Sequence, residues 1–283
     1  MRKKNRSLSL HNKAEGALSY IVLVLGACMV ILPVLWMFIT AVKSDTEIYQ
    51  MNGSILPLEV TFTSFMRIWR DYDFALYFRN SLLVTVVAVL VSLIASALTG
   101  YGATRFNFKG KSAFLSFILM TQMFPSIMLL VPFYKILSIY GLNNSLVGLC
   151  VVYISFTIPF CSWMMVGYYR TIPVEIDESA AIDGASSMQT FLRITLPLVR
   201  PGLVSSAIYA FITCWNEYMF AAILIMNDKM KTAAVAIAEM NGYYRIAWND
   251  MMAASLVASV PLIIAFIFMQ KSFISGLTAG AVK

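Results

Sequence analysis

The sequence predicts an all-α, polytopic integral membrane protein with six transmembrane helices. Hydrophobic residues make up 60% of the 283 residues and charged residues only 12%, and the mean hydropathy is +0.77. A soluble domain cannot bury this much apolar surface, so the lipid bilayer must be the solvent for most of the chain. The apolar residues also gather in runs of about 20 or more, the length that a helix needs to cross a bilayer.

The chain divides into a tail, 1–16, and a transmembrane domain, 17–283. The first apolar run follows a basic tail but is long enough to span and has no small-residue cleavage site near its end, so it is interpreted as a retained helix and not as a signal peptide. Prolines inside the third span, Pro125 and Pro132, predict kinks. The predicted spans are 17–42, 80–104, 112–134, 145–169, 202–226 and 251–273, with a polar loop at 170–201.

The distribution of lysine and arginine predicts that both termini are cytoplasmic. With the N-terminus inside, the inner segments hold thirteen of these residues and the outer segments eight. The short basic turn Arg105–Lys111 is the clearest part of this bias. The loop 170–201 is then cytoplasmic as well. In a membrane protein the net charge of +7 reports such inner loops, so nucleic acid is excluded as a partner.

Residues for catalysis are missing from the sequence. No GxxxxGK[ST] phosphate-binding loop is present, and the lone histidine, His11, lies in the polar tail. The four cysteines lie inside apolar runs without a CxxC pair, which favours buried free thiols. We therefore expect no catalytic residue, no cofactor and no metal ligand in this chain.

The segment Val174–Pro201 is the longest polar interruption in the C-terminal half. Its small residues and early glycine predict a short helix that ends at Gly184, and Ser186 with Gln189 forms a capping-box pattern that predicts a second short helix through Arg193. Such helices suit close contact with another surface, although the residues fit an ordinary amphipathic loop equally well. Four of the chain's fourteen carboxylates fall within nine residues there: Glu175, Asp177, Glu178 and Asp183.

A more specific pattern runs through the same segment. Glu178-Ser179-Ala180 is followed by Asp183-Gly184-Ala185, by Ile194 ten residues after the glycine, and by Leu196-Pro197. This pattern resembles the EAA loop of ABC importer permease subunits, with Ser179 in place of the usual first alanine. The resemblance implies that these residues dock to a cytosolic ATPase, with Gly184 allowing the sharp turn. Glu178 and Asp183 are expected to pair with donors on the ATPase or on this chain.

Inside the predicted spans ionisable residues are nearly absent, and the exception is Glu217. A charge at the centre of a bilayer costs about 2.5–3.5 kcal/mol on insertion scales, so it must face protein or water. Asn216 and Glu217 are therefore candidate polar groups of a translocation path. A hydrogen bond between helices, or a salt bridge with a partner, explains Glu217 equally simply.

Two further stretches carry the resemblance. Trp215-Asn216-Glu217-Tyr218 is similar to the fifth core helix of the same family, and Gly276–Lys283 is similar to the tail of carbohydrate-importer permeases, particularly the maltose-type second permease subunit. The resemblance implies a type I ABC importer permease in a bacterial cell membrane. It also implies the partners: a second, related permease in a heterodimer, two cytosolic subunits that bind ATP and Mg, and an extracytoplasmic sugar-binding protein.

The predicted function is the permease half of an ATP-driven sugar importer. ATP binding on the partner would move the docked loop as a lever and switch the helices between inward- and outward-facing states. One alternative keeps the class and changes the cargo to peptides, amino acids or phosphate. Another is a secondary transporter driven by an ion gradient, which predicts repeated broken helices and several intramembrane carboxylates. A third alternative is a structural membrane scaffold that transports nothing, but this alternative does not explain the docking loop.

Overall fold

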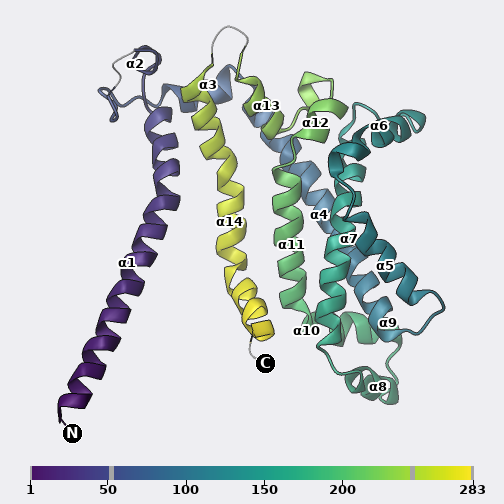
Figure 1. Cartoon of the computed structure of the whole chain (residues 1–283). Coiled ribbons are helices and arrows are strands. Elements are labelled where there is room, and N and C mark those ends of the chain that lie inside the picture. Colours follow the sequence, from purple (N-terminus) through teal and green to yellow (C-terminus); the bar gives the residue numbers. More distant parts are fainter. Residues whose placement is uncertain (1, 51–53, 243–245, 282–283) are drawn as a thin grey trace. The chain divides into compact units, whose positions relative to one another are not determined.

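The computed structural model describes residues 2–50, 54–242 and 246–281, and in these ranges the regular elements are all helices (Figure 1). An isolated bridge joins Asn241 to Ile246. The elements are, in chain order, α1 (Arg2–Ala41), α2 (Asp45–Ile48), α3 (Thr63–Arg70), α4 (Phe74–Arg105), α5 (Lys111–Thr121), η1 (Ser126–Leu129), α6 (Leu130–Ile139), α7 (Leu146–Arg170), α8 (Glu175–Ile182), α9 (Ser187–Thr190), the π-turn η2 (Phe191–Thr195), α10 (Leu196–Leu198), α11 (Arg200–Trp215), α12 (Met219–Leu224), η3 (Asp228–Met230), α13 (Ala233–Glu239) and α14 (Trp248–Ala281).

Within the described ranges, four stretches are long and apolar enough to cross a bilayer: Ser19–Ala41, Phe74–Arg105, Leu146–Arg170 and Trp248–Phe268. The number rises to six if two bent helix pairs each count as one span: Lys111–Thr121 with Ser126–Ile139, and Ser187–Leu198 with Arg200–Trp215. These six stretches agree in order with the six predicted spans. Their bounds differ from the predicted ones, most of all in the fifth.

The predicted third span, 112–134, is not one straight helix. α5 ends at Thr121, and the chain resumes as η1 and α6, which continue to Ile139 at an angle of 98° to α5. Pro125 explains the break, because it has no N–H to donate and disfavours helical backbone in the residue before it. Pro132 falls in the first turn of α6, where a missing N–H is tolerated.

The predicted fifth span, 202–226, is interrupted as well. α11 ends at Trp215 and α12 begins at Met219. At the break the side-chain amide of Asn216 donates to the carbonyl oxygen of Ile212, 3.1 Å away. This bond competes with a continuing helix, as the short amide side chain of asparagine often does.

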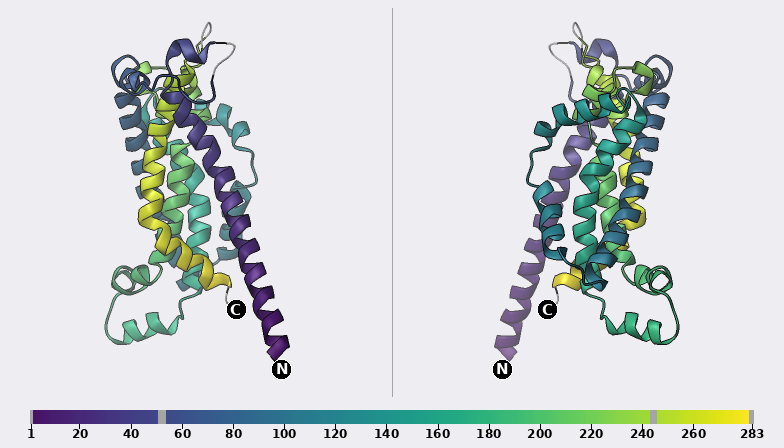
Figure 2. Two further views of the ribbon diagram at one scale, coloured as in Figure 1. Left: turned by 90° about the vertical axis from the view of Figure 1, so that its left-hand side faces the viewer. Right: turned by 90° about the vertical axis from the view of Figure 1, so that its right-hand side faces the viewer.

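The chain separates into two compact units, and the larger one comprises Asp73–Glu239 and Ala258–Lys283. In it α4 and α7 pack along each other, and α11 packs against both. The elements α8 and α9 lie at one end of these helices, and α6, α12 and α13 lie at the other (Figures 1 and 2). The predicted loop 170–201 thus lies at the opposite end of these helices from α12 and α13.

Small and hydroxyl side chains allow close contact between α4 and α7. The hydroxyls of Ser92 and Thr157 are 2.6 Å apart in the buried interface. A Cβ atom added to Gly100 would lie 2.7 Å from Cβ of Met165, so only glycine fits this contact. In a bilayer such packing and interhelical hydrogen bonds replace the hydrophobic effect as the force that joins helices.

The smaller unit comprises Met1–Tyr72 and Met240–Val257 and is organised by Arg67 of α3. Its Nη2 atom lies 2.9 Å from Asp45 Oδ1 and 2.7 Å from Asp250 Oδ1. Hydrogen bonds to these carboxylates raise the pKa of the Arg67 guanidinium. Tyr72 donates to Asp250 Oδ2 at 3.1 Å, and burial beside that carboxylate raises the pKa of the phenol. These contacts join α2, α3 and the start of α14.

Candidate functional site

The first short helix of the loop 170–201 is α8, and its ends follow the sequence. Glu175, Asp177 and Glu178 occupy the first turn, where negative charge is favourable beside the free N–H groups of a helix. The helix ends at Ile182, and Gly184 then takes φ +82°. An L-residue rarely adopts this backbone, so the predicted turn at Gly184 is confirmed.

The second short helix begins where the capping box predicts. The Ser186 hydroxyl accepts a hydrogen bond from the Gln189 N–H at 3.4 Å, and the Ser186 N–H donates to Gln189 Oε1 at 2.8 Å. The helix does not stop at Arg193, however, but widens into the π-turn η2 and continues as α10. Pro197 has no N–H to donate to the carbonyl four residues earlier, which is the reason for the wide turn.

Most of the predicted coupling residues are on the surface. Ala180 is buried, and Ala185, Ile194 and Leu196 are half-buried. In the described part of the chain no ion pair reaches Glu178 or Asp183, so their carboxylates are open to another molecule. Ile182, which the sequence pattern did not select, is 87% exposed. The exposed members of the predicted set are Glu178, Ser179, Asp183, Gly184 and Pro197.

The carboxylate on the inner side of α8 belongs to Asp177. Its Oδ2 atom lies 2.7 Å from Arg105 Nε, and the two side chains are only 13% and 5% exposed. The contact is an ion pair without the alignment of a hydrogen bond. Neither residue belongs to the predicted set of site residues, because the pair joins positions far apart in the sequence and no local pattern relates them.

Arg105 and Tyr101, one turn apart on α4, hold the loop in further ways. The Arg105 guanidinium donates to the carbonyl oxygens of Tyr169, at 3.4 Å, and Ile172, at 3.0 Å. The Tyr101 hydroxyl lies 3.2 Å from Asp177 Oδ1 and 3.4 Å from the carbonyl oxygen of Ser187. The cytoplasmic loop of the prediction is therefore attached to the ends of α4 and α7 at several points.

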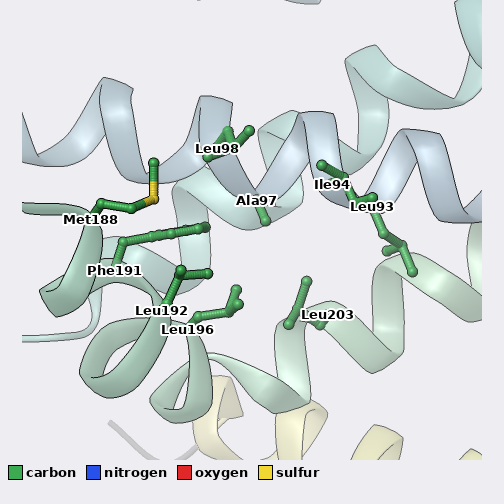
Figure 3. A pocket seen from close by; sticks show the side chains of 9 residues that line it. All are labelled: Leu93, Ile94, Ala97, Leu98, Met188, Phe191, Leu192, Leu196 and Leu203. Carbon is green, nitrogen blue, oxygen red and sulfur yellow. The ribbon is translucent and has the colours of Figure 1, made fainter.

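An apolar recess of about 460 Å³ opens between α4 and the second half of the loop. Figure 3 shows Leu93 and Ala97 of α4 on one side, and Phe191 and Leu196 of η2 and α10 on the other. All nine lining side chains are apolar. A sugar would find no hydrogen-bonding partner there, so the recess is excluded as a sugar site.

Glu217 is fully occupied by hydrogen bonds inside the protein. Oε2 accepts from the Tyr153 hydroxyl at 2.9 Å and from the Ala221 N–H at 3.0 Å, while Oε1 accepts from the Phe220 N–H at 2.8 Å. The carboxylate thus caps α12 and links it to α7, which is the hydrogen-bond alternative considered for this residue. Asn216 is exposed and remains a candidate polar group for a translocation path.

Comparison with known proteins is consistent with this arrangement. Residues 88–278 match the family described as "binding-protein-dependent transport system inner membrane component". The chain is 34% identical to the diacetylchitobiose uptake system permease protein DasC of Streptomyces coelicolor, over 97% of this chain and 99% of that one. It is 33% identical to the trehalose/maltose transport system permease protein MalG of Thermococcus litoralis, over 95% and 99%.

The fold also matches a solved structure. A chain of a bacterial ABC transporter involved in the import of the acidic polysaccharide alginate superposes with a TM-score of 0.81. The match covers 92% of this chain and 97% of that chain at 22% sequence identity. At this identity the similarity establishes the fold.

Proposed function

This chain belongs to the family of binding-protein-dependent transport system inner membrane components, and we propose that it is the transmembrane permease subunit of an ATP-driven sugar importer. The observation that carries the proposal is the agreement, over almost the whole chain, with two permeases whose names specify oligosaccharide uptake. The chain forms half of a translocation pathway in the bacterial cytoplasmic membrane, beside a second, related permease. An extracytoplasmic sugar-binding protein delivers the substrate.

The loop 170–201 is the part that docks to the cytosolic ATPase. The exposed side of α8 supports this role, because it presents the carboxylates of Glu178 and Asp183 together with the apolar side chain of Ile182. Such a surface offers both charge pairing and apolar contact to a partner. ATP and Mg bind to two copies of that partner, and this chain contributes no catalytic residue. Closure of the ATPase dimer moves the loop and switches the permease between its two states.

Purification of the intact complex tests the proposal. A tag on this chain, expressed with the proteins of its own cell, should retain a second permease and an ATP-binding subunit. In proteoliposomes the complex should take up oligosaccharide in the presence of ATP and the binding protein. A chain that purifies alone and moves solute on an ion gradient would overturn the proposal, and ATP-driven uptake of peptides, amino acids or phosphate would reject the sugar part alone.

Gly184→Arg tests the docking loop within that assay. We expect the variant to insert normally and to lose ATP-driven uptake, because the turn after α8 is disturbed and a bulky cation is added beside the docking surface. Gly110→Arg is the matched control, since Gly110 also has a positive φ, +89°, and also has open space around its Cβ position, but lies outside the loop. Equal loss in both variants would show that backbone strain alone is responsible.

A further inference from the structure

α8, the first helix of the docking loop, has little apolar anchorage. Of its eight residues only Ala180 is buried, and an alanine side chain removes little apolar surface from water. The second half of the loop differs, because Phe191 is buried in a cluster with Tyr101 of α4 and with Met165 and Tyr169 of α7. Packing alone therefore fixes η2 to the long helices and leaves α8 weakly attached.

The ion pair of Arg105 with Asp177 supplies the missing attachment. Both side chains are nearly buried, and a buried charge that loses its partner is strongly unfavourable. Separation of α8 from α4 would break this ion pair together with the contact between the Tyr101 hydroxyl and Asp177. We therefore expect the ion pair of Arg105 and Asp177 to stay closed while α8 moves, so that α8 and the end of α4 move together.

The shape of arginine extends this link to a third helix. A guanidinium is planar, always charged and able to donate several hydrogen bonds at once. Arg105 directs two of its nitrogens to the carbonyl oxygens of Tyr169, in the last turn of α7, and of Ile172, just after that helix, while Nε faces Asp177. Lysine has a single charged nitrogen and cannot hold all three partners in this way.

The carboxylates of α8 and of the residue that follows it thus have different surroundings on the two sides of the helix. Asp177 faces the long helices and is neutralised within the chain, whereas Glu178 and Asp183 are exposed. The Tyr101 hydroxyl strengthens the inner side, because it lies within hydrogen-bonding distance of both Asp177 and the carbonyl oxygen of Ser187. A force applied to the exposed side of α8 is transmitted to α4 and α7 through the contacts on the inner side of that helix.

We propose that Arg105 is the positioning residue of this permease, which transmits movement of α8 to α4 and α7 through its contacts with Asp177, Tyr169 and Ile172. This inference rests on the proposed function, since it assumes that an ATPase moves α8. Arg105 does not contact ATP or sugar. Its role is to keep α8 and the two long helices moving as one body.

The experiment uses the complete importer in proteoliposomes and measures sugar transported per ATP hydrolysed. For Arg105→Gln and Asp177→Asn we expect this ratio to decrease by about tenfold or more while ATP hydrolysis continues. A decrease of this size lies within the roughly 5–150-fold range of typical coupling energies. The double variant should be no worse than the poorer single variant, because both substitutions remove the same contact. Asp177→Glu keeps a carboxylate at this position, so this variant should keep most of the transport-to-hydrolysis ratio of the unmodified chain.

Lys109→Gln is the matched control, since it also removes a positive charge and is exposed four residues after Arg105. Its ratio should equal that of the unmodified chain. An unchanged ratio in Arg105→Gln and Asp177→Asn would overturn the inference. So would loss of membrane insertion or of the bound ATPase in both variants, which would make the pair purely structural. Failure of the proposed function is seen separately, in an unmodified chain that retains no ATPase.

Discussion

The Tyr153 hydroxyl donates a 2.9 Å hydrogen bond to Glu217 Oε2, joining α7 to the break between α11 and α12. The same carboxylate accepts the N–H groups of Phe220 and Ala221, which begin α12. An ionisable residue in a span is expected to be expensive and functional. Here its carboxyl oxygens stabilise an interrupted helix by accepting hydrogen bonds, and the interruption would otherwise expose backbone groups at membrane depth.

Substitution of Glu217 should therefore reduce stability. Glu217→Ala leaves the N–H groups of Phe220 and Ala221 without their acceptor and leaves the Tyr153 hydroxyl only the carbonyl oxygen of residue 217, 3.4 Å away. Each unsatisfied buried group costs about 1–3 kcal/mol. Tyr153→Phe removes one donor and leaves Glu217 its backbone partners, so it should cost less, about 0.5–1.5 kcal/mol. Thermal unfolding of the complex in detergent measures both. If Glu217→Gln kept its unfolding temperature and lost sugar uptake, the translocation-path interpretation would be the correct one.

A comparison of two glycines on α4 tests the close contact with α7. Gly100→Ala places a methyl group within 3 Å of the Met165 Cβ and of the Tyr169 ring, and overpacking of this kind costs about 1–3 kcal/mol. Gly102→Ala, two residues further along the same helix, meets nothing within 4 Å. It should be neutral, or stabilising by about 0.5–1 kcal/mol through the helix preference of alanine. The difference in unfolding temperature between the two variants is the measurement, and equal values would contradict the tight contact.

Two arginines on α3 provide a similar pair in the smaller unit. Arg67→Gln leaves Asp250, whose side chain is 3% exposed, without its cation, and loss of one partner from a buried pair costs about 3–5 kcal/mol. Arg70 is 90% exposed, and its Nε lies 4.0 Å from Asp71, so Arg70→Gln should have no measurable effect. Limited proteolysis of residues 45–72 in membranes distinguishes the variants. Equal cleavage of both would show that the Arg67 contacts do not organise this unit.

The sequence by itself determined the class of the protein and the local form of the loop 170–201. Hydropathy places the six apolar stretches, because a bilayer accepts only backbone that satisfies its own hydrogen bonds. The capping box at Ser186 and the turn at Gly184 depend on residues within one or two turns, so a local pattern predicts them correctly. The resemblance to the EAA loop depends on the same short spacing.

Only the tertiary structure decided which charged residues face each other. Arg105 and Asp177 are 72 positions apart and Tyr153 and Glu217 are 64 apart, and no local pattern relates such positions. The tertiary structure also decided how the third and fifth spans are interrupted. Pro125 predicts a kink but not an angle of 98°, and the interruption at Asn216 is stable because Tyr153 and the first N–H groups of α12 converge on one carboxylate. Local preferences set where helices can form, while the burial of charge between packed helices sets how they are joined.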